Sequence, residues 1–230
     1  MLTEFGPEIW IADGPEVVAA LGFHYPTRMA VVRLAGGGLF VWSPTAPTAR
    51  IRADVDALGE VRHLVAPNSL HHLFIADWKR AYPGARLHAP PGLREKRSDL
   101  DFDDDLTDTP PSCWAGEVDQ AIMRGNRITD EVVFFHAGSR TVLFTDLLQR
   151  LPAGWFSGWR ALVARLDLMA EAEPSVPRKF RLAFTDRVAA RSSLDHILSW
   201  PAEKLLIAHG MPVTEDGRAV IARAFGWLTA

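Results

Sequence analysis

Two adjacent histidines are the strongest chemical signal in this chain. His71 and His72 end the segment Pro67-Asn68-Ser69-Leu70-His71-His72, which follows an apolar run at 63–66 and precedes helical spacing from Phe74 to Tyr82. The run predicts a strand and the spacing predicts a helix. We therefore expect both imidazoles to lie in a strand-to-helix turn, where they are well placed to hold a ligand.

Asp146 and His209 are expected at the ends of two other strands. Two apolar runs, Glu131–His136 and Thr141–Thr145, flank Ala137-Gly138-Ser139-Arg140 and predict a hairpin that ends at Asp146. A third run, Lys204–Ala208, predicts a buried strand that ends in His209-Gly210. A carboxylate and an imidazole are thereby delivered to strand ends.

The first half of the chain predicts strands with helices between them. Met29–Leu34 and Leu39–Trp42 flank Gly36-Gly37-Gly38 and predict a hairpin, since neither phosphate-loop nor dinucleotide spacing surrounds the glycines. Thr48–Leu58 has helical spacing with Thr48 as N-cap, and a strand follows from Val61. Further short strands are expected at Glu8–Ala12, Ala85–Ala89 and Glu117–Met123.

The second half is predicted to be mainly helical. Apolar residues recur every three or four positions in Trp159–Met169. Arg178–Trp200 is one long stretch with the same helical spacing. Asp216–Leu228 predicts a closing helix. Between the halves, six aspartates fall in eleven residues from Ser98 to Asp108, but the pattern of a calcium loop is absent, so a solvated loop is expected.

Composition limits the classes of protein. The 230 residues are 48% hydrophobic and 23% charged, which suffices for a substantial core, and no linker divides them, so we expect one domain over 1–230. There is no 18-residue apolar run and no secretion signal, which predicts a cytoplasmic protein without a membrane partner. A net charge of -3 argues against nucleic acid as a partner. The lone Cys113 excludes an internal disulfide and a cysteine-cluster metal site, so any metal must sit on histidine and carboxylate ligands.

The order of these elements resembles the metallo-β-lactamase superfamily along nearly the whole chain. In that superfamily the motif H-x-H-x-D-H follows a strand like the one before Pro67. More narrowly, the chain resembles a bacterial branch known mainly as a domain of unknown function. The resemblance implies an α/β protein with a four-layer αββα sandwich, and a metal site at one edge where several strands end.

Placed on the superfamily motif, the turn keeps only part of the ligand set. The first two histidines of the motif fall at Pro67 and Ser69, its aspartate at His71 and its last histidine at His72. The next histidine of the family would fall near Arg127, where this chain has none. One of the two metal positions therefore loses its histidines.

The second metal position is kept. The bridging aspartate of the family matches Asp146, preceded by Leu143-Phe144-Thr145, and its final histidine matches His209 in Ile207-Ala208-His209-Gly210. The resemblance thus implies one divalent ion, Zn, Fe or Mn, on His72, Asp146 and His209, with His71 as a fourth contact. His71 and Asp146 would be the catalytic residues, with His71 as a proton relay.

Two functions from different classes follow. The first is a mononuclear metal-dependent hydrolase of an ester, thioester or lactone type bond, which retention of Asp146 and His209 favours. The second is an inactive relative that binds a small molecule or partner through the same edge, which loss of histidines at Pro67 and Ser69 favours. Singly, each residue also has a structural interpretation: the histidine pair as a helix cap, His209 as a strand-end hydrogen bonder, and Asp146 as a turn residue.

A few other residues are secondary candidates. His24 lies in a loop that could overhang the site and contact substrate, and His136 lies at a hairpin tip, exposed or functional. Arg127 and Glu131 are expected to form an ion pair in the vacated metal position. The aromatic loop Trp155–Trp159 belongs to the core, walls a pocket or forms the contact of a homodimer.

Overall fold

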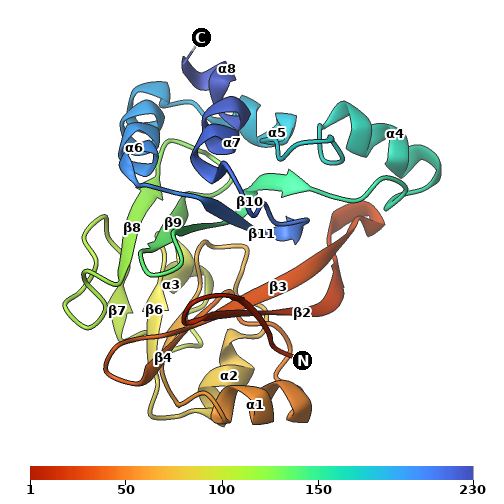
Figure 1. Ribbon diagram of the computed structural model, residues 1–230. Helices are drawn as coiled ribbons and strands as arrows, with labels where there is room; N and C mark the ends of the chain where they lie inside the picture. The colour runs from red at the N-terminus through yellow and green to blue at the C-terminus, as the bar shows by residue number, and fades with distance from the viewer. Residues whose placement is uncertain (230) are drawn as a thin grey trace.

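The computed structural model describes residues 1–229 and contains two β-sheets packed face to face (Figure 1). The first sheet has seven strands in chain order. It runs antiparallel from β1 to β4 and parallel from β4 to β7. Its strands are β1 (Thr3–Gly6), β2 (Ile9–Val18), β3 (His24–Arg33), β4 (Gly38–Trp42), β5 (Glu60–Val65), β6 (Arg86–Ala89) and β7 (Asp104–Asp105).

The second sheet has four strands in the order β11-β10-β9-β8. The pair β10 and β11 is parallel, whereas β9 is antiparallel to both of its neighbours. These strands are β8 (Val118–Met123), β9 (Glu131–His136), β10 (Thr141–Arg150) and β11 (Lys204–Gly210).

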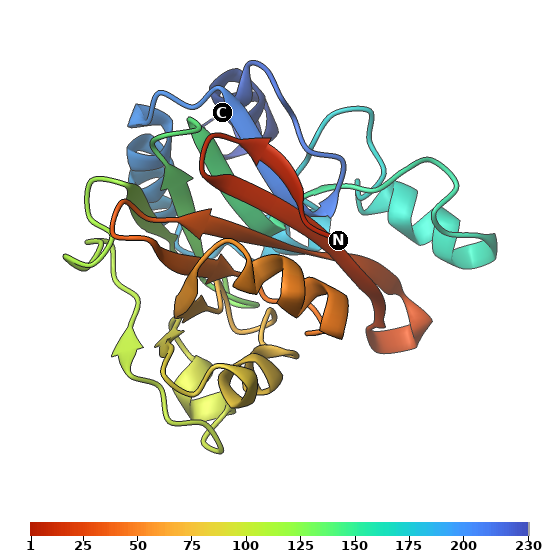
Figure 2. The same ribbon diagram turned by 60° about the horizontal axis from the view of Figure 1, so that its bottom comes forward.

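Helices cover the outer faces of both sheets (Figures 1 and 2). The first sheet is covered by α1 (Ala49–Asp56), α2 (Ile75–Ala81) and α3 (Leu93–Lys96). The second is covered by α5 (Arg178–Ala183), α6 (Arg187–Ser199), α7 (Gly217–Ala224) and α8 (Gly226–Thr229). The helix α4 (Gly158–Leu166) projects to one side, near the short turn η1 (Ala20–Gly22). The predicted αββα sandwich is confirmed.

Three apolar clusters hold the four layers together. Phe40 and Trp42 of the first sheet meet Phe134 and Leu206 of the second in the cluster between the sheets. Two further clusters join each sheet to its own helices. Because burial of apolar surface is the main favourable contribution to folding, this central cluster fixes how the two sheets face each other.

Several elements agree with the sequence-based expectations. The hairpin of β3 and β4 forms around Gly36–Gly38, and α1 begins after Thr48, whose side chain accepts a hydrogen bond from the Ile51 amide at 3.2 Å. The strand and helix that flank the histidine pair are β5 and α2.

Three expectations about lengths are wrong. The stretch Arg178–Trp200 forms two helices, because Asp186 accepts a hydrogen bond from the Ala189 amide at 2.9 Å and starts α6 anew. The closing stretch is likewise divided into α7 and α8. The strand expected to end at Thr145 continues to Arg150, so Asp146 lies within β10.

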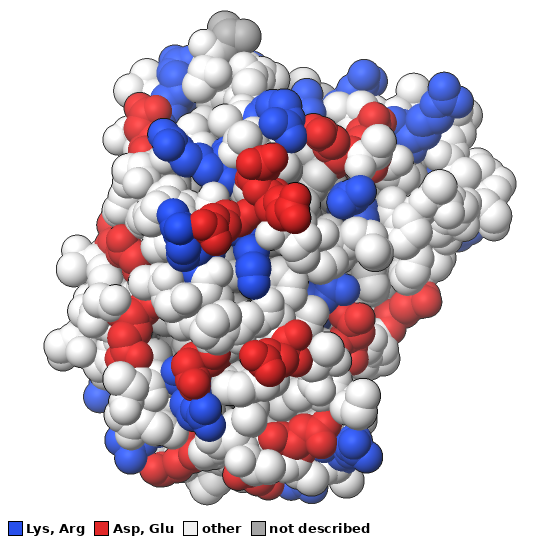
Figure 3. Space-filling view, in the orientation of Figure 1, with Lys and Arg blue, Asp and Glu red and all other residues white. Residues whose placement is uncertain are grey.

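Charged side chains are mixed over the surface that Figure 3 shows, with lysine and arginine next to aspartate and glutamate. In the acidic loop, Asp99 pairs with Arg97, Asp105 with Arg94 and Asp108 with Arg124. Among residues 1–229, no helix has the length and apolar character needed to span a membrane.

A pair of histidines is buried beside the central cluster. His63 and His88 lie with ring nitrogens 3.1 Å apart and pack against Trp114, and Asp104 lies 3.5 Å from His88. Burial lowers the pKa of His63 to about 4, aided by Arg86, and burial and His63 lower the pKa of His88 to about 4. Both rings are therefore neutral in the folded protein at neutral pH.

This pair makes the fold sensitive to acid. In the unfolded chain these histidines protonate near their ordinary pKa of 6.5, so the unfolded state binds more protons at every pH between that value and 4. Their stabilising contribution is complete above pH 6.5 and decreases as the pH falls toward 4. The unfolding free energy should fall by several kcal/mol as the pH drops through this range, and we expect the double variant His63→Leu/His88→Leu to lose much less. Urea unfolding at several pH values measures it, with the exposed His196→Gln as control, and an unchanged pH slope would contradict the assignment.

Candidate metal centre

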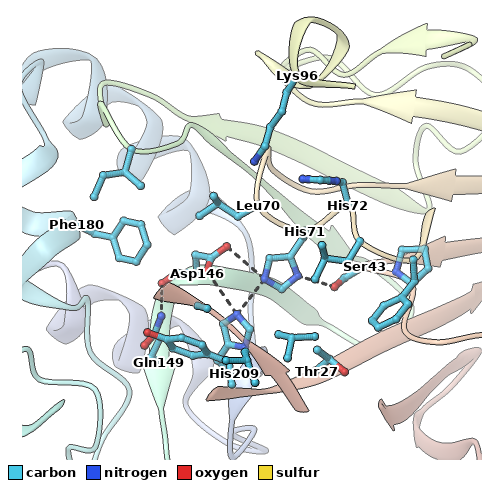
Figure 4. A pocket seen from close by; sticks show the side chains of 18 of the residues that line it. Thr27, Ser43, Leu70, His71, His72, Lys96, Asp146, Gln149, Phe180 and His209 are labelled. Carbon is cyan, nitrogen blue, oxygen red and sulfur yellow. Dashed lines mark hydrogen bonds and ion pairs between the residues drawn. The ribbon is translucent and has the colours of Figure 1, made fainter. Parts of the chain in front are cut away.

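Three side chains meet at one edge of the sandwich (Figure 4). His71 Nε2 lies 3.0 Å from His209 Nε2 and 3.2 Å from Asp146 Oδ2, and His209 Nε2 lies 3.4 Å from Asp146 Oδ1. His71 comes from the turn after β5, and the other two come from β10 and β11. The two sheets therefore each contribute to one cluster of ligand atoms.

The Nδ1 atoms of both imidazoles, which point away from the cluster, already have hydrogen-bond partners. His209 Nδ1 lies 2.7 Å from the carbonyl oxygen of Pro26, which can only accept, so Nδ1 carries a proton and Nε2 is the nitrogen left for a cation or for a contact with Asp146. His71 Nδ1 lies 2.9 Å from Ser43 Oγ, which can donate or accept. Such contacts at the far nitrogen fix the ring orientation of metal-binding histidines.

The residues present fit a single divalent ion. Two lone pairs cannot face each other at 3.0 Å without repulsion, so either a proton or a cation must lie between the two Nε2 atoms. Two ligands about 2.1 Å from a tetrahedral zinc ion lie about 3.4 Å apart, which is close to the separations here. Two imidazoles and one carboxylate suit Zn, Fe or Mn and leave coordination positions open.

Asp146 is positioned by an irregularity in β10. Between the pairs Phe144–Ile207 and Gln149–His209, the register with β11 shifts, so the intervening residues of β10 leave the ladder. The buried carboxylate of Glu131 accepts hydrogen bonds from three amides freed in this way, those of Thr145, Asp146 and Leu147, at 2.6 to 3.1 Å. Glu131 therefore accepts the hydrogen bonds of the free amides in the bulge and directs Asp146 toward the site.

Asn68 connects this bulge to the histidine turn. Its Nδ2 lies within hydrogen-bond distance of Glu131, Thr145 Oγ1 and Asp146 Oδ2, the last at 2.7 Å. Its Oδ1 accepts from the amides of Leu70 and His71 at 2.8 and 3.0 Å. The side chain is fully buried, so one amide group sets His71 and Asp146 relative to each other.

His209 depends on a close approach of two strands. Gly210 has φ of +139°, and a Cβ there would lie 2.1 Å from the carbonyl oxygen of Arg150, so only glycine fits. The guanidinium of Arg28 donates to the carbonyl oxygens of Ile207 and Gly210, which bracket His209. This end of β11 is thereby held against both β3 and β10.

The charges of the cluster reinforce one another. Burial opposes ionisation of Asp146, but His71 and His209 outweigh it and hold the pKa of this carboxyl well below its usual range. Burial disfavours protonation of His71, yet Asp146 raises the pKa of that imidazole above 6.5. Burial and the charge of Asp146 raise the pKa of Glu131. A positive charge between the three ligands is thus favoured.

The structure places His72 apart from this cluster, contrary to the ligand set of His72, Asp146 and His209. His72 Nδ1 lies 3.1 Å from Arg97 Nη1, and His71 takes its place beside Asp146. Burial, Lys96 and Arg97 lower the pKa of His72 to about 4. Only one of the two adjacent imidazoles lies beside Asp146, and the Asn68 bond to the His71 amide selects His71.

Secondary candidates lie elsewhere. His24 pairs with Glu16 at 2.7 Å, and the aromatic loop packs against Phe23 through Phe156 in a small apolar cluster, so neither lines the site. His136 is buried and bonded to Ser139 Oγ at 2.8 Å.

The expected ion pair of Arg127 and Glu131 is wrong. Glu131 is fully buried and accepts from Asn68 and backbone amides, whereas Arg127 is exposed. The charge of an arginine would be costly to bury here, and the bulge amides already satisfy the carboxylate.

A cavity of about 420 Å³ opens above the three ligands. Its walls are largely apolar, with Val17, Leu70, Ile128 and Phe180 among them, and its size is typical of small-molecule sites. Gln149 also lines it, and its buried Oε1 has no hydrogen-bond partner among the described residues. This oxygen is available to a donor group on a bound molecule.

Sequence reasoning missed Asn68 and assigned Glu131 the wrong partner. A weak signal was present in both cases, because Asn68 follows Pro67 in a turn and favours side-chain bonds to amides two and three residues on. Glu131 stands at the start of an otherwise apolar strand, where an acid needs buried donors. Their mutual contact, 63 residues apart, had no local signal.

The family model described as "Domain of unknown function (DUF4336)" matches residues 7–157, which include His71 and Asp146 but end before His209. No curated protein matches the sequence.

Solved structures share the fold. A metallo-β-lactamase from Pontibacter korlensis is 14% identical with a TM-score of 0.67, and the alignment covers 100% of this chain and 98% of the other. The metallo-β-lactamase FIM-1 from Pseudomonas aeruginosa, in its mono-zinc form, is 11% identical with a TM-score of 0.64, covering 100% and 96%. A metal-soaked flavodiiron core, Flv1 from Synechocystis, is 8% identical with a TM-score of 0.66, covering 100% of this chain and 60% of that one.

We expect Asn68→Ala to weaken both stability and the ligand cluster. The substitution leaves the Leu70 and His71 amides without their acceptor and frees Asp146, so the unfolding free energy should fall by about 2 to 4 kcal/mol. Urea unfolding measures this loss, and zinc titration calorimetry measures the loss of metal affinity. Ser69→Ala in the same turn is the matched control. Equal behaviour of the two variants would show that Asn68 does not organise the site.

Proposed function

The chain belongs to the family described as Domain of unknown function (DUF4336) and has the metallo-β-lactamase fold, and from this premise we propose that it is a mononuclear metal-dependent hydrolase. One observation supports this most directly: the Nε2 atoms of two orientated imidazoles and the Asp146 carboxylate converge below an open cavity. The proposed ligands of one Zn, Fe or Mn ion are His71, Asp146 and His209.

The proposed reaction is hydrolysis of an ester, thioester or lactone type bond. A divalent ion, when bound, supplies Lewis-acid activation of water and of an acyl oxygen. The protein contributes by fixing the ligands: Pro26 orients His209, Ser43 orients His71, and Asn68 orients Asp146. The apolar walls limit access of bulk water, which strengthens electrostatic interactions at the reacting bond.

The geometry supports this proposal over a binding protein without activity. Lost histidines at Pro67 and Ser69 remove one metal position of the superfamily pattern, yet His71 supplies a second imidazole for the remaining position. A protein that only held a ligand would not need two imidazoles and a carboxylate with their outer nitrogens fixed and their inner atoms facing one point.

We expect about one equivalent of metal in untagged protein purified without chelator. His71→Ala and His209→Ala each remove one of three ligands and should lose the metal, whereas His72→Ala, on the neighbouring residue, should keep it. Elemental mass spectrometry measures the content of all four proteins. Absence of metal after reconstitution with Zn, Mn or Fe would refute the proposed centre, and retention in His71→Ala would refute its ligand set.

Activity is tested with simple chromogenic acyl esters. Hydrolysis of 4-nitrophenyl butyrate should fall at least about 100-fold after removal of metal with dipicolinate and should return with added metal. His209→Ala should match the metal-free protein, and His196→Gln, at an exposed position outside the cavity, should stay near the unmodified protein. Hydrolysis that is insensitive to metal removal would contradict metal-dependent catalysis.

A further inference from the structure

The charges around the cavity are unbalanced. Of the described residues that line it, Asp146 is the one carboxylate, whereas Lys96 and Lys179 contribute two cations. Any divalent ion on His71, Asp146 and His209 would make this excess of positive charge larger. A molecule that reaches the Lys96 side of the cavity therefore meets a local positive charge, which favours an anionic group.

The two lysines differ in whether a nearby carboxylate neutralises their charge. Lys179 lies 3.4 Å from the carboxylate of Asp167 and 3.2 Å from the Tyr25 hydroxyl, so its charge is compensated within the protein. Lys96 donates to the carbonyl oxygen of Ser69 at 2.6 Å, and none of the carboxylates in residues 1–229 lies within 4.0 Å of it. Lys96 is the cation left available to a ligand.

His72 adds a neutral donor beside Lys96 (Figure 4). A guanidinium can only donate, so the contact of Arg97 Nη1 with His72 Nδ1 requires Nδ1 to accept. The proton of the imidazole is therefore on Nε2, which is a hydrogen-bond donor. Arg97 itself is bound to Asp99 through two nitrogens and is not free for a ligand.

Apolar side chains line the cavity and its mouth. Leu70, Leu73 and Ile128 are 37%, 58% and 44% exposed, which is unusual for large apolar residues grouped at one opening. Phe180 closes the inner wall. A ligand with a hydrocarbon portion would remove this surface from water and gain free energy in proportion to the area covered.

From this arrangement we infer that the site takes an amphiphilic acid, whose anionic group is bound by Lys96 and His72 and whose hydrocarbon portion lies along Leu70, Ile128 and Phe180. This inference rests on the proposed function, because it names the substrate class of that hydrolase. The substrate would be an acyl compound that carries a negative charge at one end. Binding of the anion itself requires only the residues of the cavity mouth.

Titration calorimetry with two eight-carbon probes tests the inference. 1-Octanesulfonate carries a charge and is a weak metal ligand, and 1-octanol has the same chain without a charge. The full-length protein as purified should bind the sulfonate at least about 10-fold more tightly than the alcohol, because a charge-assisted hydrogen bond distinguishes them. Equal affinities, or no binding of either probe, would overturn the inference.

Matched variants assign the preference to Lys96. Lys96→Met should abolish the preference for the sulfonate and leave octanol binding unchanged, and Lys96→Arg should preserve it. Lys204→Met is the control, because Lys204 also donates to a backbone carbonyl, that of Phe5, but lies outside the cavity. Ile128→Ser should weaken both probes alike. A preference that survives Lys96→Met would overturn the assignment, and equal loss of both probes in that variant would indicate a merely structural role.

Metal content is measured on the same samples. Protein without metal that still shows the Lys96-dependent preference would refute the metal centre but uphold the anion site. Protein with one metal ion and no preference would refute the anion site alone.

Discussion

The site depends on how three backbone amides of β10 are satisfied after that strand leaves its ladder. Unpaired amides at the centre of a protein cost free energy, and the Glu131 carboxylate accepts all three, from Thr145, Asp146 and Leu147. The bulge turns the side chain of Asp146 toward His71 and His209. A strand that stayed in register would have directed its residues alternately to the two faces of the sheet, without this displacement.

The same carboxylate joins the two halves of the sandwich. Asn68 leaves the first sheet after β5 and bonds to Glu131 and Asp146 of the second, and the Pro67 carbonyl accepts from the Val132 amide at 2.8 Å. These contacts are possible because apolar packing around Phe40 and Phe134 holds the two sheets close together. Apolar packing thus sets the distance between the sheets, and a few buried polar groups set their register at the site.

In the cavity above the ligand cluster, the negative and positive groups lie in different places. A single carboxylate lies at the bottom, surrounded by imidazoles, and two lysines and largely apolar side chains form the walls. In a largely apolar setting each charge acts over a longer range than in water, so the few polar groups that remain determine what can bind. The arrangement combines a place for a cation with a preference for an anionic partner.

The sequence by itself determined most elements of this protein, because strand and helix periodicities are local and the alternation of β4, α1, β5, α2 and β6 follows from them. The four layers were predicted from the resemblance to the metallo-β-lactamase superfamily. It also determined that His209 would stand near the end of a strand, whereas Asp146, expected at a strand end, lies within β10. Only the tertiary structure decided that His71, and not His72, contacts Asp146 and His209, because that choice depends on Asn68 contacts with residues far along the chain. Local patterns do not encode such long-range polar contacts, and so neither the partners of Glu131 nor the Lys96 side of the cavity could be predicted from the sequence.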